Sequence, residues 1–371
     1  PDRPDHPQIH GIGESIDMSA STSPSGRGND LLPRMGDLRQ LARQIFANRD
    51  QGPLHRFGLD VHDVANLELL PAIRRARDYH LYAFDNTRYL DLYRGESFNL
   101  LGYSLSGFQL GIKNRISQSL WQGLPHPLHK QVKRTLERCF PNHCALICPD
   151  RYRVIGVLEL LGIKPERALL PLKEDLVGGE AARDLSYWFP FTGSPGPVSI
   201  AVIPSLGPYV LLVDTRIYSH HLKSFGTHEH EVFSILDWIG HQVPVFALTG
   251  LVTALSTMEG LGAFAGMGAA VAPGSTVTLG ASKHPRTRSL QTHLGVWRES
   301  AWQAIALGHW KRTGPYLHHD FKPAAYGIIF RKALETGILL HPRSSGVNTL
   351  PGVMSPGEQA KLEEILAFAP D

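Results

Sequence analysis

Short apolar segments alternate with longer amphipathic ones along most of this 371-residue chain. Residues 198–203 and 209–213 are apolar runs typical of buried β-strands, whereas residues 127–139 and 151–162 are long enough for helices. An alternation of this kind predicts an α/β fold, with a smaller α+β portion at the C-terminal end. Because only 204–208 separates the two strands and a parallel crossover needs about a dozen residues or more, they are predicted to pair antiparallel or to lie in different sheets.

Local patterns predict further elements. Apolar and aromatic residues flank the turn residues Asp85 and Asn86, which predicts a β-hairpin over 80–92. The other predicted elements are helices at 38–47, 106–121, 230–240 and 296–307, strands at 243–248 and 276–279, and, over 325–370, a helix, a strand and a closing helix whose first turn holds Glu358.

The composition is that of a globular protein, with 42% hydrophobic and 19% charged residues. The 37 basic and 34 acidic residues give a net charge of +3, too little to predict nucleic-acid binding. The least charged stretch, 260–282, contains six glycines and too few large apolar residues for a membrane span. The chain starts without a secretion signal, and its three cysteines (Cys139, Cys144 and Cys148) are expected as thiols, so we expect a cytoplasmic protein.

Four regions are predicted along the chain. Residues 1–30 are rich in serine, glycine and proline and are expected to form a mobile leader. They are followed by an N-terminal segment that contains the hairpin (31–105), a large α/β domain (106–310) and a small C-terminal domain (311–371).

Three motifs resemble one enzyme family. DNTRYLDL (85–92) and NLLGYS (99–104) resemble the N-terminal hairpin of class III pyridoxal-phosphate aminotransferases, which include ornithine aminotransferase and glutamate-1-semialdehyde aminomutase. Thr87 stands where that family has glycine, and Tyr103 where it usually has histidine. The segment 333–366 is similar to the small C-terminal domain of the family. The resemblance implies a large domain with a mostly parallel central sheet, a small α+β domain, a dimer, and pyridoxal phosphate as cofactor.

The resemblance also implies where the cofactor would be held. The phosphate loop would follow 144–147; there Arg151 is the candidate phosphate ligand, whereas Asp150 is expected to cap the next helix. Asp214, at the end of YVLLVD, is the candidate partner of the pyridine nitrogen, or else a helix cap or turn residue. A second register makes 243–250 the corresponding strand, and the acidic residue is then lost.

The Schiff-base lysine decides whether that chemistry is present. No lysine lies between Lys223 and Lys283, so Lys283 is the candidate, provided that its loop is two residues longer than in the family. The sequence therefore predicts a divergent relative without Schiff-base catalysis, with a binding or scaffolding role as a homodimer or as a heterodimer with a related subunit. The alternative is an active aminotransferase or aminomutase that uses Lys283.

Two further candidate sites lie outside the cofactor set. His220, His221, His228 and His230 are interleaved with carboxylates and form a candidate metal site, although a polar surface loop is the favoured interpretation. Arg343, in HPRSSG, is the candidate ligand of a substrate carboxylate, with an ordinary surface arginine as the alternative.

Overall fold

The computed structural model describes residues 60–103, 108–120, 122–163, 171–177, 185–204, 207–264 and 304–370. All of them lie in one compact unit, Asp50–Asp371. The predicted leader, the helix at 38–47, the strand at 276–279 and most of the helix at 296–307 lie outside the described residues. The described part of that last segment, 304–307, is not helical.

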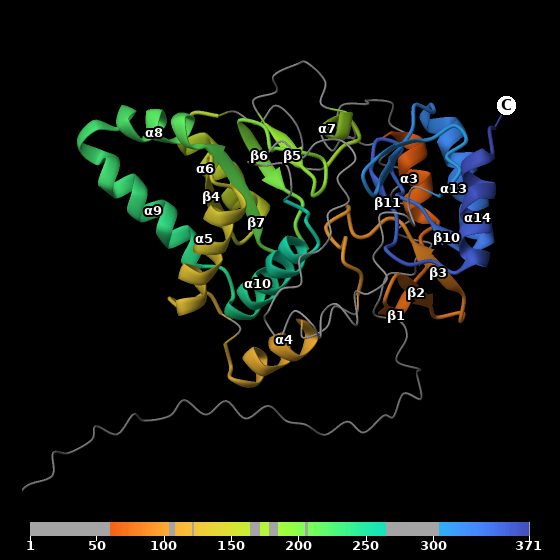
Figure 1. Cartoon of the computed structure of the whole chain (residues 1–371), viewed down its shortest axis with the longest axis horizontal. Coiled ribbons are helices and arrows are strands. Elements are labelled where there is room, and N and C mark those ends of the chain that lie inside the picture. Colours follow the sequence, from red (N-terminus) through yellow and green to blue (C-terminus); the bar gives the residue numbers. More distant parts are fainter. Residues whose placement is uncertain are drawn as a thin grey trace, which may run out of the picture. The chain divides into compact units, whose positions relative to one another are not determined.

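Helices and strands alternate along the described chain, as the sequence predicts (Figure 1). The helices are α3 (Val61–Glu68), α4 (Phe108–Ser117), α5 (Pro127–Cys139), α6 (Arg151–Leu160), α7 (Glu174–Val177), α8 (Thr215–Ser224), the 3-10 helix η1 (Gly226–His228), α9 (Glu229–His241), α10 (Val245–Gly260), α13 (Pro323–Thr336) and α14 (Pro356–Ala367). The strands are β1 (Ile73–Arg77), β2 (His80–Ala83), β3 (Arg88–Asp91), β4 (His143–Cys148), β5 (Ser186–Trp188), β6 (Val198–Ala201), β7 (Tyr209–Asp214), β8 (Lys311–Thr313), β9 (Tyr316–His318), β10 (Ile338–Leu339) and β11 (Asn348–Thr349). Across the described ranges, none of the helices has the length and apolar character needed to cross a bilayer.

The large region contains a four-stranded sheet in the order β4-β7-β6-β5. β7 runs antiparallel to both of its neighbours, and β5 and β6 form the single parallel pair among these described strands. The prediction of a mostly parallel central sheet is therefore wrong here. The physical reason is the short connection from β6 to β7, which cannot cross over the sheet and returns directly in the antiparallel direction that its length predicts.

Different helices cover the two faces of this sheet. Leu211 and Val213 of β7 lie in a core shared with α6, α8 and α9, whereas Val210 and Leu212 pack with α5 and α10. This division follows from the period of two along a strand, which points successive side chains to opposite faces. Because both faces are buried, the strand reads as a continuous apolar run.

The predicted strand at 243–248 is instead the start of a helix. Pro244 is the N-cap residue of α10, which continues for 16 residues from Val245 to Gly260. A short apolar run is compatible with a strand or with a buried helix, and periodicity alone does not separate them. The prediction was wrong because the run was read over six residues, although it continues well beyond strand length.

The C-terminal elements pack on the N-terminal hairpin. β2 and β3 form the predicted hairpin, and β10 pairs in parallel with β3, which gives the order β1-β2-β3-β10. α13 ends at Gly337, whose φ of 84° favours glycine, and β10 begins at the next residue. A capping box between Ser355 and Glu358 begins α14. The helix, strand and closing helix predicted over 325–370 are confirmed, and a further sheet has the order β11-β9-β8.

Candidate functional site

Asp214, the predicted partner of the pyridine nitrogen, caps a helix. It ends β7, and its carboxylate accepts a hydrogen bond from the backbone N–H of Arg216 at 2.8 Å. Nε and Nη2 of Arg216 also donate to it, each at 3.3 Å. These bonds lower the pKa of the Asp214 carboxyl group. The carboxylate is therefore engaged by α8, as the helix-cap alternative predicts.

Asp150 and Arg151 lie at the start of α6. Asp150 caps this helix, as predicted, and its Oδ1 accepts the backbone N–H of Arg153 at 2.9 Å. The guanidinium of Arg151 is exposed and lies 5.2 Å from the centroid of the Tyr152 ring. A carboxylate thus occupies the helix N-terminus, where the helix dipole and the backbone N–H groups would otherwise favour a phosphate group.

These two predicted cofactor contacts lie at opposite ends of one strand pair. β4 and β7 are antiparallel, so Asp214 lies opposite His143 at the start of β4, whereas Arg151 follows the end of β4 at Cys148. At about 3.4 Å per residue, the length of β4 alone separates its ends by about 17 Å. One molecule of pyridoxal phosphate, a single six-membered ring with a phosphate arm, is shorter than this separation, so we expect that it does not contact both Asp214 and Arg151.

The second register does not restore a complete set of cofactor contacts. It needs a strand over 243–250, and that segment leads into and forms α10. Lys283 lies outside the described residues. Asp214 and Arg151, as the structure places them, therefore do not fit a common cofactor molecule.

The histidine cluster lies on helices rather than in the favoured surface loop. His220 and His221 belong to α8, His228 to η1 and His230 to α9. His228 contacts Glu231 at 3.1 Å, and both side chains are exposed. Within the described ranges, no three His, Cys, Asp or Glu side chains are placed to hold a metal ion.

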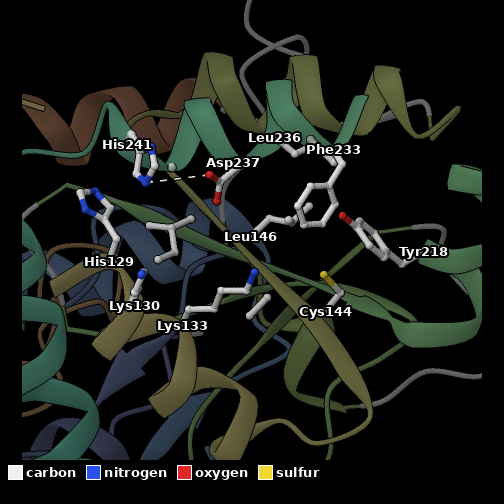
Figure 2. Close-up of a pocket in the computed structure, with 13 residues that line it drawn as sticks. His129, Lys130, Lys133, Cys144, Leu146, Tyr218, Phe233, Leu236, Asp237 and His241 are labelled. Carbon is white, nitrogen blue, oxygen red and sulfur yellow. Dashed lines mark ion pairs between the residues drawn. The ribbon is translucent and has the colours of Figure 1, made fainter. Parts of the chain in front are cut away.

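α9 also borders a cavity of about 300 Å³ along β4 (Figure 2). Figure 2 shows Asp237 and His241 on α9, 4.0 Å apart, with His129 of α5 beside His241. At the other end of the cavity, Cys144 and Tyr218 are hydrogen-bonded to each other, and burial raises the pKa of the Cys144 thiol. These polar groups are engaged with one another within the chain.

Arg343 is buried, so its interpretation as a surface arginine is wrong. Its side chain is 4% exposed and forms an ion pair with Glu96. His341 Nδ1 accepts the backbone N–H of Arg343 at 3.0 Å, so His341 Nε2 carries a proton and donates to Glu96 at 2.9 Å. Burial would raise the pKa of Glu96, but the interaction with His341 and the charge and hydrogen bond of Arg343 outweigh it and lower this pKa to about 2. Arg343 is thus held within the chain.

Glu96 belongs to a turn with an unusual backbone conformation. Arg94, Gly95, Glu96 and Ser97 have φ values of 51°, 54°, 61° and 66°, all in the left-handed region. The backbone N–H of Ser97 donates to the C=O of Tyr93 at 3.2 Å, which closes one left-handed helical turn. For a residue other than glycine this conformation costs roughly 1–2 kcal/mol. Backbone strain of this kind concentrates at functional sites.

Arg94 is buried on this turn and is only partly hydrogen-bonded. The residue is 0% exposed, and its Nε donates to the backbone C=O of Asp91. Its Cζ lies 4.2 Å from the centroid of the Tyr79 ring, so the guanidinium stacks on that ring. Nη1 and Nη2 have no hydrogen-bond partner in the described part of the chain. Burial lowers the pKa of Arg94, and the negative charge of Asp91 opposes this effect.

Arg94 lines a cavity of about 680 Å³ whose walls are mainly apolar. Phe108, Ile112 and Ile116 line it from α4, and Phe98 lines it from the segment that follows the turn. A cavity of this size, lined by apolar side chains and a few polar groups, is typical of a site for a small molecule.

Asp91 lies near Arg94 but is held by other bonds. Its Oδ1 accepts the backbone N–H of Arg94 at 3.1 Å, and its Oδ2 accepts the hydroxyl group of Tyr103 at 2.7 Å. Burial and the Asp91 carboxylate together raise the pKa of Tyr103, so the hydroxyl stays protonated as a donor. These bonds keep both carboxylate oxygens engaged while Nη1 and Nη2 of Arg94 stay unpaired.

Comparison of the sequence with known proteins gives short matches. No family model matches the chain. Uncharacterised proteins of Treponema pallidum and Borreliella burgdorferi are each 35% identical to it over 71 residues, which is 19% of this chain. The match spans about a quarter of the length of these curated relatives, 23% and 26% respectively.

Structural similarity covers most of the chain. An omega-transferase from Vibrio fluvialis JS17 matches with a TM-score of 0.50 and 8% identity, over 80% of this chain and 97% of that one. A glutamate-1-semialdehyde aminomutase from Pseudomonas aeruginosa PAO1 matches with a TM-score of 0.50 and 11% identity, over 89% of this chain and 93% of that one. The chain has the fold of the class III aminotransferases. At these identities the likeness shows the fold alone.

Within this aminotransferase fold, Arg94 and Glu96 are the residues that the sequence analysis missed. They lie between the two motifs that carry the resemblance, 85–92 and 99–104. The available signal was the charged run Arg94-Gly95-Glu96, which begins three residues after the strand that ends at Asp91, because charged residues in a loop that follows a strand often belong to a site.

Proposed function

We propose that this chain is a binding protein built on the class III aminotransferase fold, and that it does not form a Schiff base with pyridoxal phosphate. The observation that carries the proposal is the separation of Asp214 and Arg151 at opposite ends of the β4–β7 pair. An acid at the pyridine nitrogen strengthens the electron sink of pyridoxal phosphate, and it has to act on the same molecule that the phosphate site holds. The positions of these two residues do not meet that requirement.

The local bonding of both candidates supports the same conclusion. The Asp214 carboxylate accepts three hydrogen bonds from Arg216, including one from its backbone N–H. The start of α6 carries the carboxylate of Asp150, which would repel a phosphate dianion. Binding therefore depends on other residues, and the cavity beside Arg94 supplies a suitable place for it.

Pyridoxal phosphate itself provides the test. We expect the purified chain, mixed with it and then reduced with borohydride, to show no aldimine absorbance and no stoichiometric label on any lysine by peptide mass spectrometry. Lys283→Ala should then behave like the wild type, with Lys223→Ala as the matched control. A stoichiometric label on Lys283 that disappears in Lys283→Ala, together with amino transfer by the wild type, would support the active aminotransferase or aminomutase instead.

The free thiols of Cys139, Cys144 and Cys148 support a cytoplasmic protein, and the resemblance supports one that assembles as a homodimer or with a related subunit. Sedimentation equilibrium at a series of concentrations tests the first arrangement, because a homodimer dissociates on dilution. A chain that remains monomeric at all concentrations leaves the heterodimer as the arrangement to be tested by adding the related subunit.

A further inference from the structure

We infer that the cavity beside Arg94 binds a monocarboxylate that carries an apolar body. This inference rests on the proposed binding function and names the class of its ligand. It stands on three features of the cavity: an unpaired guanidinium, an apolar wall formed by one helix, and a local balance of charge.

The guanidinium of Arg94 lacks partners on one side. Nε is bonded to the Asp91 backbone, and the Tyr79 ring stacks on the guanidinium. Nη1 and Nη2, which share the remaining edge, have no partner in the described part of the chain, although the residue is 0% exposed. Two parallel N–H donors on one edge match the two oxygens of a carboxylate. Native structures rarely leave such buried donors unsatisfied.

The opposite wall of the cavity is the apolar face of α4. Phe108, Ile112 and Ile116 are spaced four residues apart, so they lie on one face of this helix, and all three line the cavity. None of the α4 residues is buried, and the Ile116 side chain is 43% exposed. An apolar body placed against this face would remove it from water, which is favourable in proportion to the area covered.

The charges around the cavity favour a single negative charge on the ligand. Arg94 is positive, Asp91 is negative, and Lys113 of α4 also lines the cavity. A phosphate dianion would bring a second negative charge close to Asp91. In an amino acid, the α-ammonium group beside the carboxylate would lie close to the positive charge of Arg94. Asp91 would not offset this repulsion with a hydrogen bond, because both of its carboxylate oxygens are already engaged. We therefore expect a simple carboxylate to bind more tightly than an amino acid of the same chain length.

The experiment uses the full chain and isothermal titration calorimetry with four eight-carbon probes. These are octanoate, octanamide, octyl phosphate and 2-aminooctanoate. We expect octanoate to bind at least about tenfold more tightly than octanamide, because hydrogen bonds to a charged group are the stronger ones. Equal affinities for these two probes, tighter binding of octyl phosphate or 2-aminooctanoate, or no binding of octanoate would each overturn the inference.

Two variants locate the site. Arg94→Met should weaken octanoate binding at least about tenfold and leave octanamide binding nearly unchanged. Ile112→Trp, at a half-buried position of α4, should fill the apolar part and weaken both probes, and it provides the test if Arg94→Met does not fold. Arg138→Met, which removes an exposed arginine paired with Glu259, is the matched control and should bind like the wild type.

Octanoate affinity unchanged in Arg94→Met or in Ile112→Trp would contradict the assignment. The proposed function and this inference can fail separately. Labelling of Lys283 would overturn the first without any titration of octanoate, whereas the calorimetry contains no pyridoxal phosphate and reports on the Arg94 cavity alone.

Discussion

Arg94 and Arg343 are both buried arginines, and each has at least one guanidinium nitrogen without a hydrogen-bond partner in the described residues, but the guanidinium of Arg343 also forms an ion pair with a carboxylate. Arg343 forms an ion pair with Glu96, whose carboxylate also accepts a hydrogen bond from His341. Nη1 and Nη2 of Arg94 have no partner in the described residues. Arg94 lies two residues before Glu96 in the same left-handed turn, but the Glu96 carboxylate forms its ion pair with Arg343.

This contrast separates a structural ion pair from a buried guanidinium with unpaired donors. Removing one member of a buried ion pair leaves the other buried and unpaired, which is strongly destabilising. A buried guanidinium with two unpaired nitrogens already bears a desolvation cost in the folded state, so its removal does not add the cost of a broken ion pair. Substitution of the two arginines should therefore affect the free energy of unfolding differently, with a loss only at Arg343.

The largest effect is expected for Arg343→Met. The substitution keeps most of the side-chain volume but leaves the half-buried Glu96 carboxylate with His341 and without its arginine. We expect the free energy of unfolding to fall by about 3–5 kcal/mol. Urea denaturation followed by circular dichroism measures this change.

Arg94→Met is the decisive comparison for that result. Under the same conditions it should leave the free energy of unfolding unchanged or raise it, because it removes a buried charged group whose Nη1 and Nη2 are unpaired in the described residues. Arg138→Met, at an exposed pair, should cost less than about 1 kcal/mol. If Arg94→Met were as destabilising as Arg343→Met, Arg94 would have a structural partner and the contrast would not hold.

A second prediction concerns acid stability. The pKa of Glu96 is lowered from 4.5 to about 2 in the folded chain, so the folded state binds this proton less readily than the unfolded state does. The stabilisation is fully present above pH 4.5 and is lost as the pH falls through about 2, and it amounts to about 3 kcal/mol. Unfolding free energies measured across this range should fall less steeply in Glu96→Gln.

His319 supplies an internal reference for the acid measurement. Burial lowers its pKa from 6.5 to about 3. As the pH falls, the free energy of unfolding therefore starts to drop at a higher pH because of His319 than because of Glu96. Glu96→Gln should leave the slope between pH 6.5 and 4.5 unchanged. A change of slope only in this upper range would mean that Glu96 is not the group responsible.

Elements with strong local signals could be predicted from the sequence. The hairpin around Asp85 and Asn86, the cap at Asp150, the end of α13 at Gly337 and the start of α14 at Ser355 each depend on a few neighbouring residues. The direction of β7 could be predicted as well, because the connection from β6 is short. The strand order could not, since it is decided by contacts between distant segments.

The site depends on features that the sequence does not display locally. Glu96 and His341 are 245 positions apart, so their contact follows from the fold rather than from a motif. The left-handed conformation at Arg94 has no clear signal either, because Gly95 is the only glycine in the turn. Asp214 could be recognised as either a cofactor ligand or a cap, and its hydrogen bonds with Arg216 and the pairing of β7 with β4 separate these roles.

A smaller loss of stability than that of Arg343→Met tests why Arg94 stays unpaired. Tyr103→Phe removes the hydrogen bond to Asp91 and should cost about 1 kcal/mol, measured by urea denaturation. It also frees one oxygen of Asp91 to approach Nη1 or Nη2 of Arg94, so octanoate should bind several-fold more weakly in calorimetry. Tyr326→Phe, which removes another buried hydroxyl bond, to the C=O of His341, should cost similar stability without changing octanoate affinity. Equal octanoate binding by Tyr103→Phe and the wild type would show that Tyr103 does not keep Asp91 away from the arginine.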